Sequence, residues 1–269
     1  MESSLKYIFV HCQHRSGSTA LLNTLGSLPG VYAIPEELNL LERRFVRNSV
    51  WRFAMNKWDD PENIFGSIWN SNGTFSFKTR GLINECRNFS SAGFGHFVRI
   101  IVARLVSCFL ETDNTTSNIS VIACKYVAHV SASEKLIDFF SKTSHIILVR
   151  DLSAIYFSKI NDPHMRRLRR VSLHRYCFKR LAILIFFALD YRIIVKLAYS
   201  AATRPNCYVV RYSRMEYDLK VFAATVGLDF DSVKGIAQGK ASSQRGAISK
   251  PSWIELIVLR VLGGRSYID

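Results

Sequence analysis

Short apolar runs alternate with longer helix-compatible stretches along much of this chain. Four of the runs are typical of buried strands, and they cover residues 6–12, 121–124, 145–149 and 206–211. Because strands separated by helical stretches form crossover units, this order predicts an α/β fold with a central parallel sheet flanked by helices. At 269 residues, of which 48% are hydrophobic, the chain is expected to form one domain over 1–269.

The first strand-like run leads directly into a small polar loop. Tyr7–Cys12 is followed by Gln13-His14-Arg15-Ser16-Gly17-Ser18-Thr19, and the helix-compatible segment Ala20–Leu25 comes next. A strand, a polar loop and a helix N-terminus bind phosphate groups, because backbone N–H groups converge there at the positive end of the helix dipole. A Ser/Thr-rich helix N-cap without a ligand would give the same pattern.

Two familiar phosphate loops do not fit this segment. The P-loop requires a lysine after its second glycine, whereas Ser18 follows Gly17, and the dinucleotide fingerprint requires three spaced glycines. The positive charge would instead come from Arg15, whose planar guanidinium suits phosphate or sulfate oxygens.

A second loop follows the strand-like run His145–Val149. Arg150 lies at its carboxyl end, where open α/β sheets place ligands, and Asp151 can cap the next helix. Ser158 comes about two helical turns later, on nearly the same face as Arg150. The alternative is a surface arginine followed by a mid-helix serine that bonds its own backbone.

With these two motifs the chain resembles the sulfotransferases, which transfer a sulfuryl group from 3'-phosphoadenosine-5'-phosphosulfate (PAPS) to an acceptor. Arg15–Thr19 is similar to the family's first loop, Pro-Arg-Ser-Gly-Thr/Ser-Thr/Ser, although Gln13-His14 replaces the residues before it. Ile146–Ser158 is similar to the second signature, with Ser153 where many members have a second arginine.

The resemblance implies a P-loop-like nucleotide-binding fold with PAPS as co-substrate. It implies that Arg150 and Ser158 bind the 3'-phosphate of PAPS. It also implies that the first loop holds the 5'-phosphate end, through Arg15, Ser16, Gly17, Ser18 and Thr19.

Looser matches give two catalytic candidates. Leu28–Leu38 looks like a stretch of tyrosylprotein and related bacterial-type sulfotransferases, in which a glutamate beyond the second strand is the catalytic base. Glu36 aligns best with this glutamate, and Glu37 is the alternative. Val121–Lys125 resembles the family's Lys-Asp/Thr-Pro segment without its proline, so Lys125 is a candidate for neutralising transition-state charge. The acids can also complement a helix dipole, and Lys125 can be a solvated strand end.

A third loose match ends in Tyr212. Cys207–Tyr212 is similar to the family's Val-x-Tyr-Glu-Asp-Leu strand, but Ser213-Arg214-Met215 replaces the acidic residues. Tyr212 is therefore expected to form part of the site wall, in a structural rather than a catalytic role.

The chemistry of such a site is an in-line displacement that depends on positioning and charge stabilisation. Arg15 and Lys125 would balance charge on the bridging oxygen, and Glu36 would take the proton of an acceptor hydroxyl. No metal is expected, because the seven histidines have no ligand spacing and no Cys-x-x-Cys occurs.

The region 43–111 has no motif that we can interpret. It is rich in aromatic residues that are either core or part of a helical lid or acceptor-binding insertion, among them Trp51, Phe53, Trp58, Phe65, Trp69, Phe75 and Phe77.

The net charge of +15 is high for this length. Part of it lies in Arg166–Arg170, which is typical of a solvated helix face. A basic field would steer PAPS into its site, and an acidic glycan, an acidic peptide or an anionic membrane surface could dock on it. Nucleic acid is not expected, because no recognition module accompanies the charge.

The apolar run Leu181–Leu189 predicts a buried helix rather than a membrane span. It is too short to cross a bilayer, and Asp190, Arg192 and Lys196 interrupt its continuation.

The first strand begins a few residues after Met1, which leaves no room for a signal peptide and predicts a cytoplasmic protein, or a Golgi lumenal one only if an N-terminal anchor is missing. The six cysteines fit reduced thiols. Four N-glycosylation sequons favour the Golgi lumen or are chance matches. They lie at Asn72, Asn88, Asn114 and Asn118.

The sequence thus predicts a PAPS-dependent sulfotransferase that acts on a hydroxyl acceptor. A carbohydrate or glycolipid is the first expectation, followed by a tyrosyl peptide or a small molecule. The alternative is a catalytically inactive member that binds nucleotide or an acidic polymer through its basic face.

Overall fold

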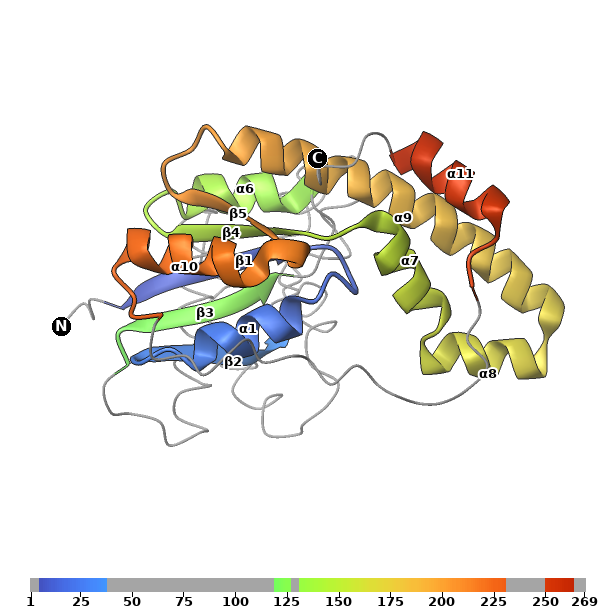
Figure 1. Ribbon diagram of the computed structural model, residues 1–269, viewed down its shortest axis with the longest axis horizontal. Coiled ribbons are helices and arrows are strands. Elements are labelled where there is room, and N and C mark those ends of the chain that lie inside the picture. The colour runs from blue at the N-terminus through green and yellow to red at the C-terminus, as the bar shows by residue number, and fades with distance from the viewer. Residues whose placement is uncertain (1–4, 38–118, 127–130, 231–249, 264–269) are drawn as a thin grey trace, which may run out of the picture.

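A computed structural model describes residues 5–37, 119–126, 131–230 and 250–263 (Figure 1). Its centre is a five-stranded sheet with strand order β2-β3-β1-β4-β5, and every adjacent pair is parallel. The strands are β1 (Lys6–Cys12), β2 (Val31–Glu37), β3 (Val121–Tyr126), β4 (Ser144–Val149) and β5 (Cys207–Arg211). The α/β class, the parallel sheet and the four predicted strands are therefore confirmed.

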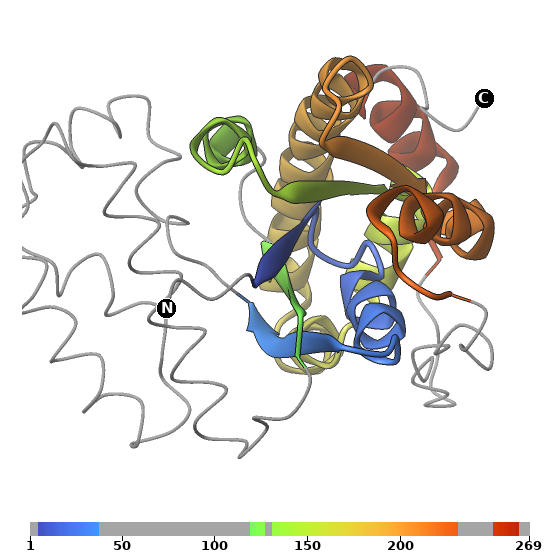
Figure 2. The same ribbon diagram turned by 90° about the vertical axis from the view of Figure 1, so that its left-hand side faces the viewer.

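Helices cover both faces of this sheet (Figure 2). One face carries α1 (Ser18–Gly26) and α10 (Met215–Val226), which follows the short 3-10 helix η2 (Tyr212–Arg214). The other face carries the long helix α9 (Leu173–Ala201). Four further helices lie around α9, namely α6 (Ser131–Phe139), α7 (Leu152–Ile160), α8 (Pro163–Val171) and α11 (Trp253–Gly263).

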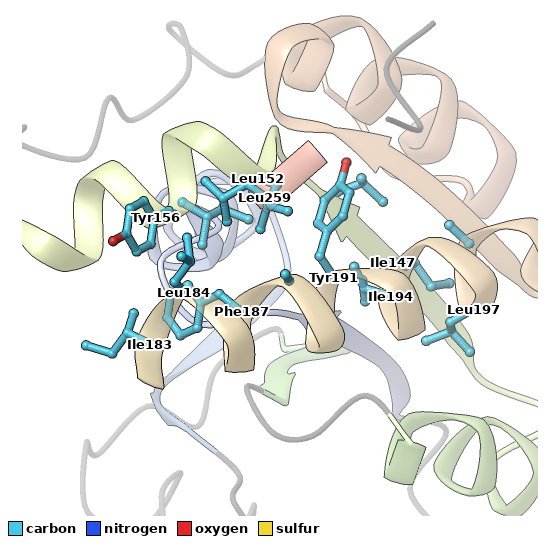
Figure 3. Packing of buried hydrophobic residues seen from close by; sticks show 14 of the residues in the cluster. Ile147, Leu152, Tyr156, Ile183, Leu184, Phe187, Tyr191, Ile194, Leu197 and Leu259 are labelled. Carbon is cyan, nitrogen blue, oxygen red and sulfur yellow. The ribbon is translucent and has the colours of Figure 1, made fainter. Parts of the chain in front are cut away.

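Strand β4 shows how the sequence builds two cores. Successive side chains of a strand point to opposite faces. Ile146 and Leu148 accordingly pack with the α1 and α10 side chains, whereas Ile147 and Val149 pack with α9. Because both faces are covered, the strand is apolar from Ile146 to Val149, which is why it could be recognised from the sequence. Figure 3 shows the α9 core, with Phe187, Tyr191 and Ile194 directed from α9 toward β4 and α7.

The helix around Leu181–Leu189 differs from the sequence prediction. This segment belongs to α9, but only one of its faces is buried: Leu184 and Phe187 pack inward, whereas Leu181, Ile185 and Leu189 are exposed. The prediction of a buried helix is therefore wrong for half of its residues. The error arises because the segment is apolar on all sides, so periodicity gives no inward direction.

A partly buried polar cluster ties α9 to α7 and α11. Arg180 of α9 forms an ion pair with Glu255 of α11, and the Tyr156 hydroxyl of α7 also donates a hydrogen bond to Glu255. Burial alone would raise the pKa of Glu255, but the hydrogen bonds from Arg180 and Tyr156 outweigh it and hold this pKa at about 2. The three helices thus share one charge-assisted network.

We expect Glu255→Gln to lower the stability by about 2 kcal/mol at pH 7, because hydrogen bonds to a charged group are lost. The folded-state pKa of about 2 lies below the ordinary value of 4.5, so this contribution is full above pH 4.5 and disappears as the pH falls toward 2. Chemical denaturation at pH 7 and at pH 3 measures both effects. Glu216→Gln, at an exposed position of α10, is the matched control. A variant gap of equal size at the two pH values would contradict the expectation.

Candidate functional site

The two predicted loops lie side by side at the carboxyl edge of the sheet (Figure 1). The chain leaves β1 toward α1 on one face and leaves the neighbouring strand β4 toward α7 on the other face. In open α/β sheets, ligands bind where adjacent strands send their connections to opposite faces. The strand order therefore places residues 13–19 and Arg150 at the position where folds of this kind bind ligands.

The backbone of the first loop has two residues with positive φ angles. Gly17 has a φ of 97° and is the N-cap of α1, and Arg15 has a φ of 67°, which is uncommon for a residue with a side chain. No side chain caps α1. The alternative interpretation, a Ser/Thr N-cap, is therefore wrong: the N-cap is a glycine, and the loop hydroxyls do not cap this helix.

Ser16 is the most enclosed hydroxyl of the loop. Its side chain is 1% exposed, and its Oγ has no hydrogen-bond partner within the described part of the chain. Ser18 is also buried, whereas Thr19 is exposed. A buried hydroxyl without a hydrogen-bond partner costs free energy. A ligand atom that accepts a hydrogen bond from Ser16 would remove this cost.

Arg150 joins the second loop to the first. Its Nη1 donates a hydrogen bond to the Arg15 carbonyl oxygen at 3.1 Å, and its guanidinium carbon lies 4.2 Å from the centre of the Tyr212 ring. A guanidinium carries five N–H donors, so this hydrogen bond leaves donors for a ligand. The contact fixes the head group of Arg150 at the edge of the loop after β1.

Tyr212 closes the same corner from the end of β5. A Cβ atom built on Gly17 would lie 2.2 Å from Cε2 of the Tyr212 ring. The ring therefore occupies the space that any side chain at position 17 would need, and it contacts Arg150 on its face. Gly17, Arg150, Tyr212 and the Arg15 carbonyl thus lie together, and the roles of these residues in binding stay a prediction.

Lys125 lies beside the loop from the opposite flank. It is 6% exposed at the end of β3, and its Nζ donates a hydrogen bond to Thr19 Oγ1 at 3.3 Å. The interpretation of Lys125 as a solvated strand end is therefore wrong. The backbones of β2 and β3 pair at Glu37 and Lys125, so Glu36 and Glu37 lie at the same edge of the sheet. Their side chains lie outside the described part of the structure.

The second motif begins as predicted. Asp151 caps α7, since its carboxylate accepts a hydrogen bond from the Ala154 N–H at 2.8 Å. Ser153, at the position of the family's second arginine, donates its hydroxyl to the same carboxylate. Ser158 lies in the last turn of α7 and is partly exposed. Its proposed contact with a phosphate is untested.

Sequence reasoning missed the residues that attach the loop to α9. The Gln13 side chain is buried and donates to the Phe187 carbonyl oxygen at 3.0 Å. Asp190 is buried close to His14: burial raises its pKa to about 6, and His14 opposes the shift. The only sequence signal was that Gln13-His14 departs from the family's loop.

A buried histidine pair was also missed. His11 Nε2 lies 2.9 Å from His145 Nδ1, between β1 and β4. Burial lowers the pKa of both rings, that of His145 to about 4, so both are neutral at pH 7.

Within the described residues, no three His, Cys, Asp or Glu side chains form a group that could hold a metal ion. No helix among them is both long and apolar enough to cross a membrane. The 43–111 region lies outside the described residues.

Comparisons with known proteins give one structural neighbour to report. No protein-family model matches the chain, and no curated protein matches it. A solved structure described as the sulfotransferase domain from the Synechococcus PCC 7002 olefin synthase aligns over 98% of this chain and 97% of its own, with 14% identity and a TM-score of 0.46. A likeness of this size does not identify a family.

For the nucleotide site that the sequence predicts, we expect Gly17→Ala to remove the thermal-shift response to nucleotides. Alanine at a φ of 97° is strained by about 1–2 kcal/mol, and its Cβ displaces the Tyr212 ring. Gly227→Ala is the matched control, because Gly227 also has a positive φ, of 76°, but its Cβ would meet no atom within 4 Å. Thermal shift with and without AMP measures the difference. Equal responses of the two variants would show that the Gly17–Tyr212 contact does not shape the site.

Proposed function

We propose that this protein is a sulfotransferase that transfers a sulfuryl group from PAPS to a hydroxyl acceptor. The observation that carries the proposal is the junction of the two loops, where Arg150 binds the Arg15 carbonyl and stacks on the Tyr212 ring that covers Gly17. A nucleotide with phosphate groups at both its 3' and 5' positions needs two anion sites of this kind within one crevice.

Residues of the first loop are suited to the 5'-phosphosulfate end. The α1 N-terminus offers backbone N–H groups without a side-chain cap, and Ser16 offers a buried hydroxyl. Arg150 offers donors for the 3'-phosphate, together with Ser158 if α7 contributes to the same site. Tyr212 would be the wall that separates the two ends.

The transfer forms a bond between the acceptor oxygen and sulfur and breaks the bond between sulfur and the bridging oxygen of PAPS. Adenosine 3',5'-bisphosphate leaves with the electron pair of that bond. Lys125, held beside Thr19, and Arg15 would stabilise the charge on the leaving oxygen. Glu36, or Glu37, would take the acceptor proton from the end of β2.

The acceptor that we favour is a carbohydrate or glycolipid hydroxyl, with a tyrosyl peptide or a small molecule as further candidates. The rival function is binding of nucleotide or an acidic polymer without transfer. The exposed arginines of α8 favour that rival, because they form a basic face.

A thermal-shift titration separates the two functions. For the proposed function, adenosine 3',5'-bisphosphate at a hundredfold excess over its Kd should raise the melting temperature by about 5 °C, and AMP should raise it less. Transfer of radiolabelled sulfate from PAPS onto fractionated cell extract then tests activity and acceptor together. An equal response to heparin, AMP and the bisphosphate, without any transfer, would overturn the proposal in favour of polyanion binding.

A further inference from the structure

Helices α9 and α11 expose an unusual apolar surface. On α9, residues at helical spacing point away from the core with exposed fractions between 40% and 72%, namely Phe178, Leu181, Ile185, Leu189 and Ile193. The opposite face of the same helix is buried. A helix that is apolar on both faces needs a second apolar environment.

Helix α11 extends this surface. It packs along α9, as Figures 1 and 2 show, and its inward side carries Glu255 and Leu259. Its outward side carries large apolar residues that are 43% to 71% exposed, namely Trp253, Ile254, Leu256, Ile257 and Val261. We call the exposed apolar side chains of α9 and α11 the α9–α11 face. Large exposed apolar side chains on two helices that pack together indicate an interaction site rather than ordinary surface.

Positive charge surrounds the α9–α11 face. Between residues 163 and 201 the chain has nine Lys and Arg residues and one acidic residue, Asp190, which is buried. Arg167 and Arg170 are exposed on α8, which packs against the start of α9. Arg192 and Lys196 are exposed further along α9, and Arg260 is exposed on α11. The partner of this surface must therefore be apolar and anionic at once.

We infer that the α9–α11 face docks on the surface of an anionic membrane. Trp and aliphatic side chains on one face, flanked by Lys and Arg, are the composition of helices that lie in the interface of a bilayer. The apolar side chains would enter the boundary between headgroups and acyl chains, and the cations of α8 and α9 would contact anionic headgroups. This inference does not depend on the proposed function.

A second copy of the chain is a poorer occupant. In a two-fold symmetric dimer the same patch meets itself, so Arg192, Lys196 and Arg260 of both copies would lie in or beside one interface. Bringing like charges together around an apolar contact costs free energy. An anionic membrane neutralises the same charges.

Vesicle flotation of the full chain tests the inference. The protein should float with vesicles of phosphatidylcholine that contain about 30% phosphatidylserine, and it should stay largely unbound with phosphatidylcholine alone, because the basic residues need anionic headgroups. Equal binding to both vesicle types, or to neither, would overturn the inference.

Two sets of variants test the two halves of the surface. The triple variant Leu181→Ser, Ile185→Ser and Ile257→Ser removes apolar contacts and should weaken binding to anionic vesicles by at least about a hundredfold. Its control is Tyr217→Ser with Val221→Ser, two exposed apolar positions of α10 on the other face of the sheet. The controls should bind as the wild type does.

The charge variant Arg167→Glu with Arg170→Glu replaces exposed basic side chains of α8, so it tests the inference independently of the apolar variant. It should weaken binding by at least about tenfold, whereas Lys6→Glu with Lys142→Glu should change it little. Analytical sedimentation of the protein without vesicles measures whether it forms a dimer. A dimer that the apolar triple variant dissociates would assign the face to a second copy and overturn the membrane inference.

Discussion

Replacing Arg150 with alanine should reduce the thermal stabilisation by adenosine 3',5'-bisphosphate to the level that AMP gives the wild-type protein. The proposed function assigns Arg150 to the 3'-phosphate, which AMP lacks. Charge-assisted hydrogen bonds of this kind contribute about 1.5–3 kcal/mol each, so two of them correspond to a loss of affinity of about a hundredfold or more. Titration of both nucleotides against both proteins measures the effect.

Two comparisons make the Arg150 result specific. Arg150→Lys keeps the charge but loses the planar fork, so its response should lie between those of the wild type and Arg150→Ala. Arg204→Ala removes an arginine at the opposite edge of the sheet, where it pairs with Asp138, and should leave the nucleotide response unchanged. If Arg150→Ala kept the full thermal stabilisation by adenosine 3',5'-bisphosphate, the assignment of the 3'-phosphate to Arg150 would be wrong.

Replacing Lys125 with methionine should reduce sulfuryl transfer by about a hundredfold or more while nucleotide binding changes little. The side chain is buried beside Thr19, and methionine has a similar length without the charge. One well-placed donor to the leaving oxygen contributes about 3 kcal/mol to the transition state. Single-turnover transfer and nucleotide titration, measured on the same preparations, separate the two effects.

Lys142→Met is the control for that experiment, because Lys142 is exposed in the turn before β4. Glu36→Gln should resemble Lys125→Met, with nucleotide binding kept and transfer lost, and Glu37→Gln identifies the base if Glu36→Gln stays active. Full transfer by Lys125→Met would show that the hydrogen bond between Lys125 and Thr19 has a structural role only.

The strands and the two loops could be predicted because their signals are local. Strand β4 is apolar on both faces, Arg150 ends it, and Asp151 follows as a helix cap, all within a few neighbouring residues. Lys125 could be placed at the end of a strand for the same reason.

The contacts that assemble the site could not be predicted. The Arg150–Arg15 hydrogen bond spans 135 positions of the sequence and the Lys125–Thr19 hydrogen bond spans 106. Both depend on β1 lying between β3 and β4, and no residue pattern specifies that order. The exposure of Leu181 and Ile185 was missed for a related reason, since hydrophobicity predicts which residues avoid water but not which side of a helix meets the sheet.

The ring of Tyr212 sits between two loops that belong to different crossover units, and it is supplied by a third strand. Its contacts with Gly17 and Arg150, together with the Arg150–Arg15 hydrogen bond, hold the two loops at one separation. Under the proposed function, that spacing would make the protein selective for the length of its nucleotide. A smaller residue at position 212 should then admit ligands whose two phosphate groups lie at other separations.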